Sequence, residues 1–355
     1  MLLLVTLVSL GSASDAPSSA VDPPAGGRHA FVVAGYAPDY RLQSLNLQAV
    51  GDSLSHVLLF SISPHANGSL STDRLPPIHM MQVGRAKKKH SHLRVLVSVG
   101  GGGRSEHFAA MAGNKASRAR FAKHLTRYVV RNHLDGADLD WEAPTNEAEA
   151  STYSKVLARL RKSFGSVSPP LELTMAMHTG GHVSLLQPAV AHVDRVHLMA
   201  YDIPDEHGQH SSELATADVV AEAISAGIPR EKLVLGIPLY GRHTEQLSRA
   251  EPYSLLRRRR GPADPEDYAG RFYFNGPGTV ARKTALAASE GLAGVMVWEL
   301  GQDDDAASTT ADARPLLPVI ASVAHRAVAA GWQAGKRATT PIEATADLAA
   351  AKDEL

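Results

Sequence analysis

The sequence has no cysteine, so no disulfide contributes to the stability of the fold. Its 36 basic and 36 acidic side chains balance, which provides no electrostatic reason to bind nucleic acid or an anionic membrane surface. Aromatic residues are scarce at 5 %, and only three of the 355 residues are tryptophan. A long groove lined with stacked rings is therefore not expected. With 44 % hydrophobic residues, the composition is that of an ordinary globular protein.

Both ends of the chain carry targeting patterns. An apolar run over 2–10 is followed by small residues at 11–14, which predicts a signal peptide over 1–14, with a buried first strand as the alternative. The run is too short to span a bilayer, and no membrane span is expected after cleavage. The terminal Lys352–Leu355 (KDEL) predicts binding to the retrieval receptor of the endoplasmic reticulum, and hence a lumenal protein. Asn67 begins a glycosylation sequon usable in that compartment.

Between these ends, short apolar runs alternate with amphipathic stretches. The runs predict strands over 30–36, 56–62, 94–99, 136–141, 171–177, 195–201, 232–239 and 294–300. The stretches predict helices over 105–132, 148–164, 215–227, 279–291 and 317–330. Eight such strands predict a (β/α)8 barrel over 29–333, without a large inserted α+β domain. Residues 15–28 and 334–355 are predicted to be flexible.

An open doubly wound sheet is the alternative architecture. Polar residues end many of the predicted strands, which favours the barrel, because an open sheet gathers its functional residues at one switch point. The widest gap between strands, 241–294, is predicted to be an extended loop. The remaining basic and histidine clusters are predicted to be solvated surface or loop residues: Lys87–Lys89, Arg257–Arg260, His178, His182, His207 and His210. None of these histidines belongs to a zinc-binding motif.

Three acids occupy alternate positions of the fourth predicted strand. Asp138, Asp140 and Glu142 then share one face, while Leu139 and Trp141 point the other way. Three ionised carboxyls side by side repel one another, and a fold tolerates this mainly where shifted protonation states are used. Glu142, nearest the carboxyl end of the strand, is best placed to donate a proton. Asp140 would share its proton, and Asp138 would tune Asp140.

Small residues after the third predicted strand provide space for these acids. Gly100 and Gly101 have no Cβ, and Ser98 can donate a hydrogen bond to Asp138. A phosphate-binding loop is disfavoured here, since neither GK[ST] nor GxGxxG is present.

Asp135–Glu142 resembles the catalytic signature of glycoside hydrolase family 18, the chitinase family. Further similarity, in the family's order, lies in Gly35–Tyr36, Phe60, Ser98–Gly101, Met199–Asp202 and Trp298. The resemblance implies retaining, substrate-assisted hydrolysis of N-acetylglucosamine oligosaccharides without metal or cofactor, in which the substrate's acetamido oxygen replaces a second carboxylate. It implies catalytic roles for Asp138, Asp140, Glu142, Tyr201 and Asp202. It implies substrate binding by Tyr36, Phe60, Ser98, Gly100, Gly101, Met199, Tyr240, Arg242 and Trp298.

Three functions remain open. The first is hydrolysis of β-1,4 bonds in chitin or chito-oligosaccharides, which Trp141 favours, because the family's glycan-cutting members often carry an acid there. The second is cleavage of the chitobiose core of N-glycans, which Lys352–Leu355 favours. The third is an inactive lectin, although such relatives usually lose the acid corresponding to Glu142. The few aromatics favour a shallow groove for short soluble substrates, and a monomer is expected.

Overall fold

The structure, a computed structural model, describes residues 30–303 and 315–339. The predicted signal peptide, the lead-in and the retrieval motif lie outside the described residues.

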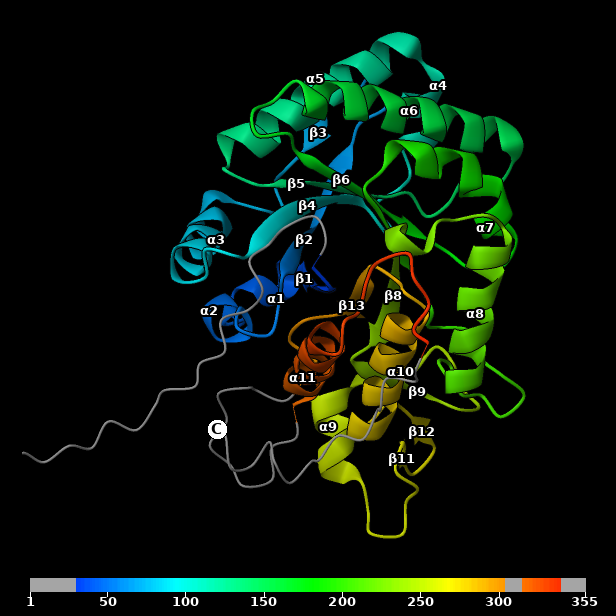
Figure 1. Ribbon diagram of the computed structural model, residues 1–355. Coiled ribbons are helices and arrows are strands. Elements are labelled where there is room, and N and C mark those ends of the chain that lie inside the picture. Colours follow the sequence, from blue (N-terminus) through cyan, green and yellow to red (C-terminus); the bar gives the residue numbers. More distant parts are fainter. Residues whose placement is uncertain (1–29, 304–314, 340–355) are drawn as a thin grey trace, which may run out of the picture.

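Eight parallel strands close into a barrel (Figure 1). They are β1 (Val32–Pro38), β2 (His56–Pro64), β4 (Arg94–Gly100), β5 (Gly136–Asp140), β6 (Glu172–Met177), β7 (Arg195–Leu198), β8 (Leu233–Pro238) and β13 (Gly294–Trp298). Strand β1 pairs with both β2 and β13, which completes the ring. The strands are almost wholly buried because helices cover them, as near-continuous apolar runs require. The predicted barrel is confirmed.

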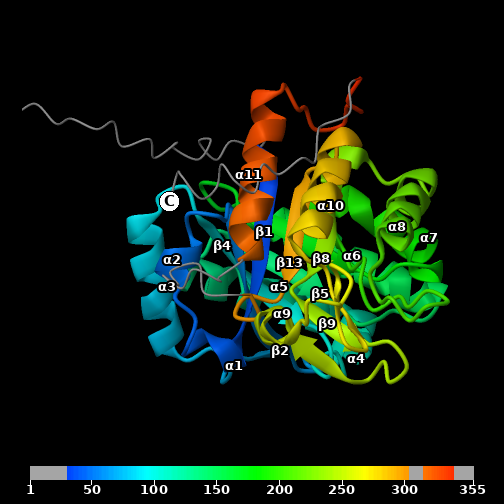
Figure 2. The ribbon, with the colours of Figure 1, turned by 90° about the horizontal axis from the view of Figure 1, so that it is seen from below.

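Helices surround this ring. They are α1 (Asp39–Leu42), α2 (Leu47–Val50), α3 (Pro77–Lys89), α4 (Phe108–Gly113), α5 (Lys115–Arg131), α6 (Glu147–Gly165), α7 (Gly181–Leu186), α8 (Glu213–Ser225), α10 (Pro277–Ser289) and α11 (Leu316–Ala329). Helices α10 and α11 lie side by side outside β13 and β1 (Figures 1 and 2). Four of the predicted helices agree with the structure to within two residues at each end.

The prediction of one helix over 105–132 is wrong, because the segment forms two helices, α4 and α5. The break falls at Asn114, whose side chain accepts hydrogen bonds from the backbone N–H groups of Ala116 and Ser117 at 2.9 and 3.0 Å. This is the capping arrangement that starts a new helix. Apolar spacing continues through the break, so periodicity alone did not reveal it.

The segment predicted as an extended loop over 241–294 is folded. Strands β9 (Tyr240–His243), β10 (Ala250–Pro252), β11 (Tyr268–Ala269) and β12 (Phe272–Tyr273) form a small antiparallel sheet beside helix α9 (Tyr253–Arg259) (Figure 1). Arg257, Arg258 and Arg259 form the last turn of α9, where positive charge favours the helix dipole. These strands were missed because each has only two to four residues.

The first residues of the predicted flexible tail contact the end of α10. Beyond α11, the N–H of Gly335 donates to the Gly291 carbonyl at 2.9 Å, and that of Ala338 to the Ser289 carbonyl at 2.7 Å. Residues 334–339 are therefore held against the end of α10.

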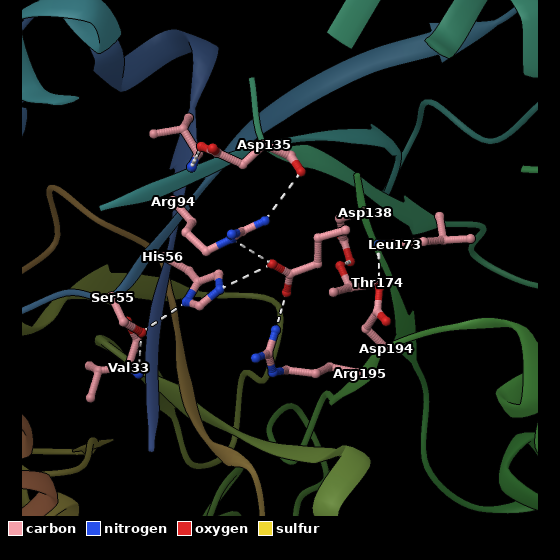
Figure 3. Close-up of polar contacts among 12 residues, drawn as sticks. Val33, Ser55, His56, Arg94, Asp135, Asp138, Leu173, Thr174, Asp194 and Arg195 are labelled. Atoms are coloured by element: carbon pink, nitrogen blue, oxygen red, sulfur yellow. Dashed lines mark hydrogen bonds and ion pairs between the residues drawn. The ribbon is translucent and has the colours of Figure 1, made fainter. Parts of the chain in front are cut away.

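A buried ion network closes the floor of the barrel, where the strands begin (Figure 3). Glu172 is buried on β6 and accepts hydrogen bonds from Arg195 on β7 and from Arg94 Nε on β4, the latter at 2.9 Å. His56 on β2 places Nε2 at 3.4 Å from the same carboxyl. A cavity of about 350 Å³ borders this floor. The network joins four strands at the end opposite the barrel mouth.

This network predicts acid sensitivity. The pKa of Glu172 lies well below its usual 4.5, because His56 and the two arginines outweigh the upward effect of burial. A depressed folded-state pKa stabilises the fold above pH 4.5, and this contribution is lost as the pH falls. We expect Glu172→Gln to lower the free energy of unfolding by about 2–3 kcal/mol at neutral pH. Urea unfolding at pH 7 and pH 3 should show a smaller difference from the wild type in acid; an equal difference would contradict the ionic account.

Candidate active site

A cleft of about 650 Å³ lies at the barrel mouth, where the parallel strands end. Eight predicted site residues line it: Tyr36, Phe60, Asp140, Glu142, Met199, Tyr201, Asp202 and Trp298. The other six, Ser98, Gly100, Gly101, Asp138, Tyr240 and Arg242, do not line the cleft. The geometry assigns these six to supporting contacts.

The acids of β5 are graded in depth along one face. Asp138 and Asp140 are 0 % and 3 % exposed, whereas the side chain of Glu142, just beyond the strand, is 28 % exposed. Trp141 points the other way and stacks on Phe108 with ring centroids 5.4 Å apart. The alternation predicted from the sequence is confirmed, and it presents Glu142 to the cleft.

Asp138 is surrounded by hydrogen-bond donors. Its carboxyl accepts from Tyr36 Oη at 2.9 Å, Ser98 Oγ at 3.2 Å and Thr174 Oγ1 at 2.6 Å. His197 Nδ1 lies 3.4 Å from the carboxyl and 3.0 Å from Tyr36 Oη. The predicted contact of Ser98 is confirmed, and Thr174 and His197 were missed. The only sequence signal for these two residues was their position in the in–out alternation along each strand, which directs their side chains into the barrel.

Asp140 is a carboxyl with a raised proton affinity. Burial raises its pKa well above the usual range, and the neighbouring Glu142 and Asp138 raise it further. Its Oδ1 atom is buried and accepts no hydrogen bond among the described residues. Asp140 is therefore suited to hold a proton and to take a new partner when a ligand enters.

Two glycines make room beside this carboxyl. Gly100 and Gly101 have φ angles of 100° and 90°. A Cβ on Gly100 would lie 2.3 Å from the Asp140 carbonyl oxygen, and one on Gly101 would lie 2.2 Å from Phe60 Cζ. Both the backbone conformation and the lack of space require glycine.

These constraints predict a difference between two alanine variants. Gly103 also has a positive φ of 70°, but a Cβ there would meet no atom within 4 Å. We expect Gly103→Ala to lower the free energy of unfolding by about 1–2 kcal/mol, from backbone strain alone. Gly101→Ala should cost about 2–4 kcal/mol, because it also displaces Phe60. Urea unfolding measures the loss of unfolding free energy in each variant. Equal losses would show that Phe60 moves aside at no energetic cost.

Residues 199–202 lie beyond β7, which ends three residues earlier than predicted. Asp202 has a φ of 61° and accepts hydrogen bonds from Tyr240 Oη at 2.7 Å and Arg242 Nη2 at 2.5 Å. Burial would raise the pKa of Asp202, but the nearby His210 ring, whose Nδ1 lies 3.3 Å away, and the hydrogen bonds from Arg242 and Tyr240 hold it well below the usual range. Tyr240 and Arg242, which were predicted to bind substrate, both contact Asp202. His210 lies in a turn between β7 and α8, so the predicted loop position is correct, but the side chain is fully buried.

Aromatic rings form the floor of the cleft. Trp298, at the end of β13, is partly buried, with its ring centroid 4.8 Å from that of Phe60 and 5.4 Å from that of Tyr36. Met199 packs against the same cluster. Tyr40, which the sequence did not single out, is 59 % exposed at the rim and donates to the buried Glu299.

Residues 32–303 match the sequence family described as Glycosyl hydrolases family 18. The chain belongs to this family. Endochitinase 1 of Metarhizium robertsii is 24 % identical over an alignment that covers 84 % of this chain and 87 % of the relative.

Solved structures show the same fold. The GH18 chitinase ChiB of Flavobacterium johnsoniae superposes with a TM-score of 0.72 at 24 % identity, over 84 % of this chain and 95 % of that one. The chitinase-like agglutinin RobpsCRA of Robinia pseudoacacia gives 0.71 at 20 % identity, over 81 % and 98 %. The fold is thus shared by proteins named as enzymes and as agglutinins.

Two histidines in this family 18 barrel were predicted to be ordinary surface or loop residues. His178 and His182 follow β6 and line the cleft. His178 Nε2 lies 3.6 Å from Glu142 Oε2. A loop position is correct, but only the structure places them at the site. No group of three potential metal ligands converges within 30–303 and 315–339.

No helix in the described part of the chain is both long and apolar enough to cross a membrane.

Proposed function

We propose that the protein hydrolyses β-1,4-linked N-acetylglucosamine oligosaccharides with retention of configuration, with Glu142 as proton donor. The observation that carries this proposal is the graded depth of the three acids, which leaves Glu142 as the β5 carboxyl at the mouth. Membership of family 18 and the similarity to a protein named endochitinase support the substrate class.

In the proposed reaction, Glu142 gives its proton to the glycosidic oxygen as the bond from that oxygen to C1 breaks. The acetamido oxygen of the same sugar forms a bond to C1, which produces an oxazolinium ion. Water, deprotonated by Glu142, then attacks C1 and opens the ring. Two inversions give net retention.

The other cleft residues would orient this sugar. Asp140, whose Oδ1 lacks a partner, would accept a hydrogen bond from the acetamido N–H. Tyr201, which lines the cleft, would donate to the acetamido oxygen. Trp298 would lie under the distorted sugar, and Asp202 would contact it from the far side.

Cleavage of the N-glycan core is the second candidate. The Lys352–Leu355 motif supports it, since N-glycans are abundant in the endoplasmic reticulum, where we propose the protein resides. Trp141 points away from the cleft and packs on Phe108 and Tyr153, so this position would affect substrate choice only indirectly. Intracellular retention that is lost when the last four residues are deleted would support this location; secretion of the intact chain would contradict it.

A lectin without activity is the third candidate. The similar TM-scores to a chitinase and to an agglutinin do not discriminate between these functions. The complete set of Asp138, Asp140, Glu142 and Tyr201 favours an enzyme.

One experiment separates the three. Chitotetraose and a Man-GlcNAc2-Asn glycopeptide are incubated with the protein, and the products are analysed by mass. We expect shorter chito-oligosaccharides by mass, and a separate NMR measurement of the initial product should show the β-anomer at its new reducing end. Cleavage of the glycopeptide alone would favour the second candidate, and binding without cleavage of either would favour the lectin.

A further inference from the structure

Strands β5 and β6 set their inward-facing residues side by side. Asp138 on β5 pairs with Thr174 on β6, and the two side chains are hydrogen-bonded. Both strands alternate with a period of two, so the next inward pair in this register is Asp140 with Ala176. The small partner leaves room beside the buried carboxyl of Asp140.

One further step of the register sets Glu142 beside His178. The structure agrees: the His178 Nε2 and Glu142 Oε2 atoms are 3.6 Å apart, with the side chains 41 % and 28 % exposed. Both residues lie just beyond the ends of their strands, and the contact is in line with the register of the paired residues before them. At this distance a protonated imidazole and a carboxylate attract each other.

Glu142 lies between Asp140 and His178. The Glu142 and Asp140 carboxyls repel each other when both are ionised, which contributes to the raised pKa of Asp140. A protonated imidazole at the mouth would attract the Glu142 carboxylate. We propose that His178 is a positioning residue for the proton donor, which holds the Glu142 carboxyl at the cleft mouth and, when charged, opposes its protonation. This inference rests on the proposed function of Glu142.

Other titratable and charged groups lie around the same cleft. Its lining includes Tyr36, Tyr40, Arg104, Asp140, His182, Tyr201 and Asp202, and Glu222 on α8 accepts a hydrogen bond from the N–H of Gly180, two residues after His178. Asp202 is held by Arg242, and Arg104 donates to Asp39 at 2.6 Å. The ring of His182 lies 5.8 Å from that of His178, and a positive charge on it would disfavour one on His178.

Two substitutions with different charges test the proposal. The neutral His178→Asn should move the alkaline limb of the kcat/KM profile for chitotetraose upward by at least about half a pH unit. The positive His178→Lys should leave the limb at or below its wild-type position. The control His207→Asn, at a histidine whose side chain is 69 % exposed beside Glu206, should match the wild type. An upward shift in both His178 variants, or in neither, would overturn the proposal.

A second measurement does not depend on turnover. The ring resonances of His178, assigned by their loss in His178→Asn, are followed by NMR against pH in the wild type and in Glu142→Gln. Loss of the carboxylate should lower the titration midpoint by at least about half a pH unit. An unchanged midpoint would show that His178 and Glu142 do not interact, even if the protein is an active enzyme. A lowered midpoint would support the interaction even if chitotetraose is not a substrate.

Discussion

Replacement of Glu142 by glutamine is expected to reduce the turnover of chitotetraose by about 10³-fold or more. The amide has nearly the same size and hydrogen-bonding reach as the carboxyl, but it has no proton to give to the leaving oxygen. The cleft walls, including Trp298 and Tyr201, are unchanged by the substitution. Binding of chitotetraose should therefore persist within a few-fold of the wild-type affinity.

Single-turnover hydrolysis and calorimetric binding measure the two effects separately. Asp135→Asn is a matched control, because Asp135 belongs to the same signature but contacts Lys87 and the Val95 backbone away from the cleft. It should retain turnover, with some loss of stability. Hydrolysis by Glu142→Gln at the wild-type rate would remove Glu142 from the proposed role.

Replacement of Asp138 by alanine should damage both stability and catalysis. The change removes the common acceptor of Tyr36, Ser98 and Thr174 inside the barrel and leaves their hydroxyl groups buried. One of the three, Tyr36, still reaches His197, which limits the loss. We expect the free energy of unfolding to fall by about 2–4 kcal/mol and turnover to fall by about 100-fold or more.

Urea unfolding and the hydrolysis rate test this expectation. Ser98→Ala is the control: it removes one donor at 3.2 Å but keeps the acceptor, so it should cost about 1 kcal/mol. The charge of Asp138 also raises the pKa of Asp140. In Asp138→Ala, Asp140 should therefore lose its proton at lower pH than in the wild type. An alanine variant as stable as the wild type would show that the three hydroxyls find other partners.

Local sequence spacing predicted the parts of this protein that backbone geometry sets. The alternation of Asp138, Asp140 and Glu142 follows from the two-residue period of a strand. Eight apolar runs separated by helical stretches predicted the closed barrel. The short strands β9 to β12 could not be predicted in this way, because two to four residues carry too little periodicity.

Contacts between distant segments were decided only by tertiary structure. Tyr36 and His197 meet at Asp138 although they are 161 positions apart. His178 and Glu142 also meet across the ends of β5 and β6, and the sequence alone does not fix the register in which those two strands pair.

The sequence by itself determined which acids share a face and which of them lies nearest the barrel mouth, since both follow from position along one strand. Tertiary structure decided which side chains surround each acid, and so where the pKa is raised, because burial and neighbouring charges come from other strands.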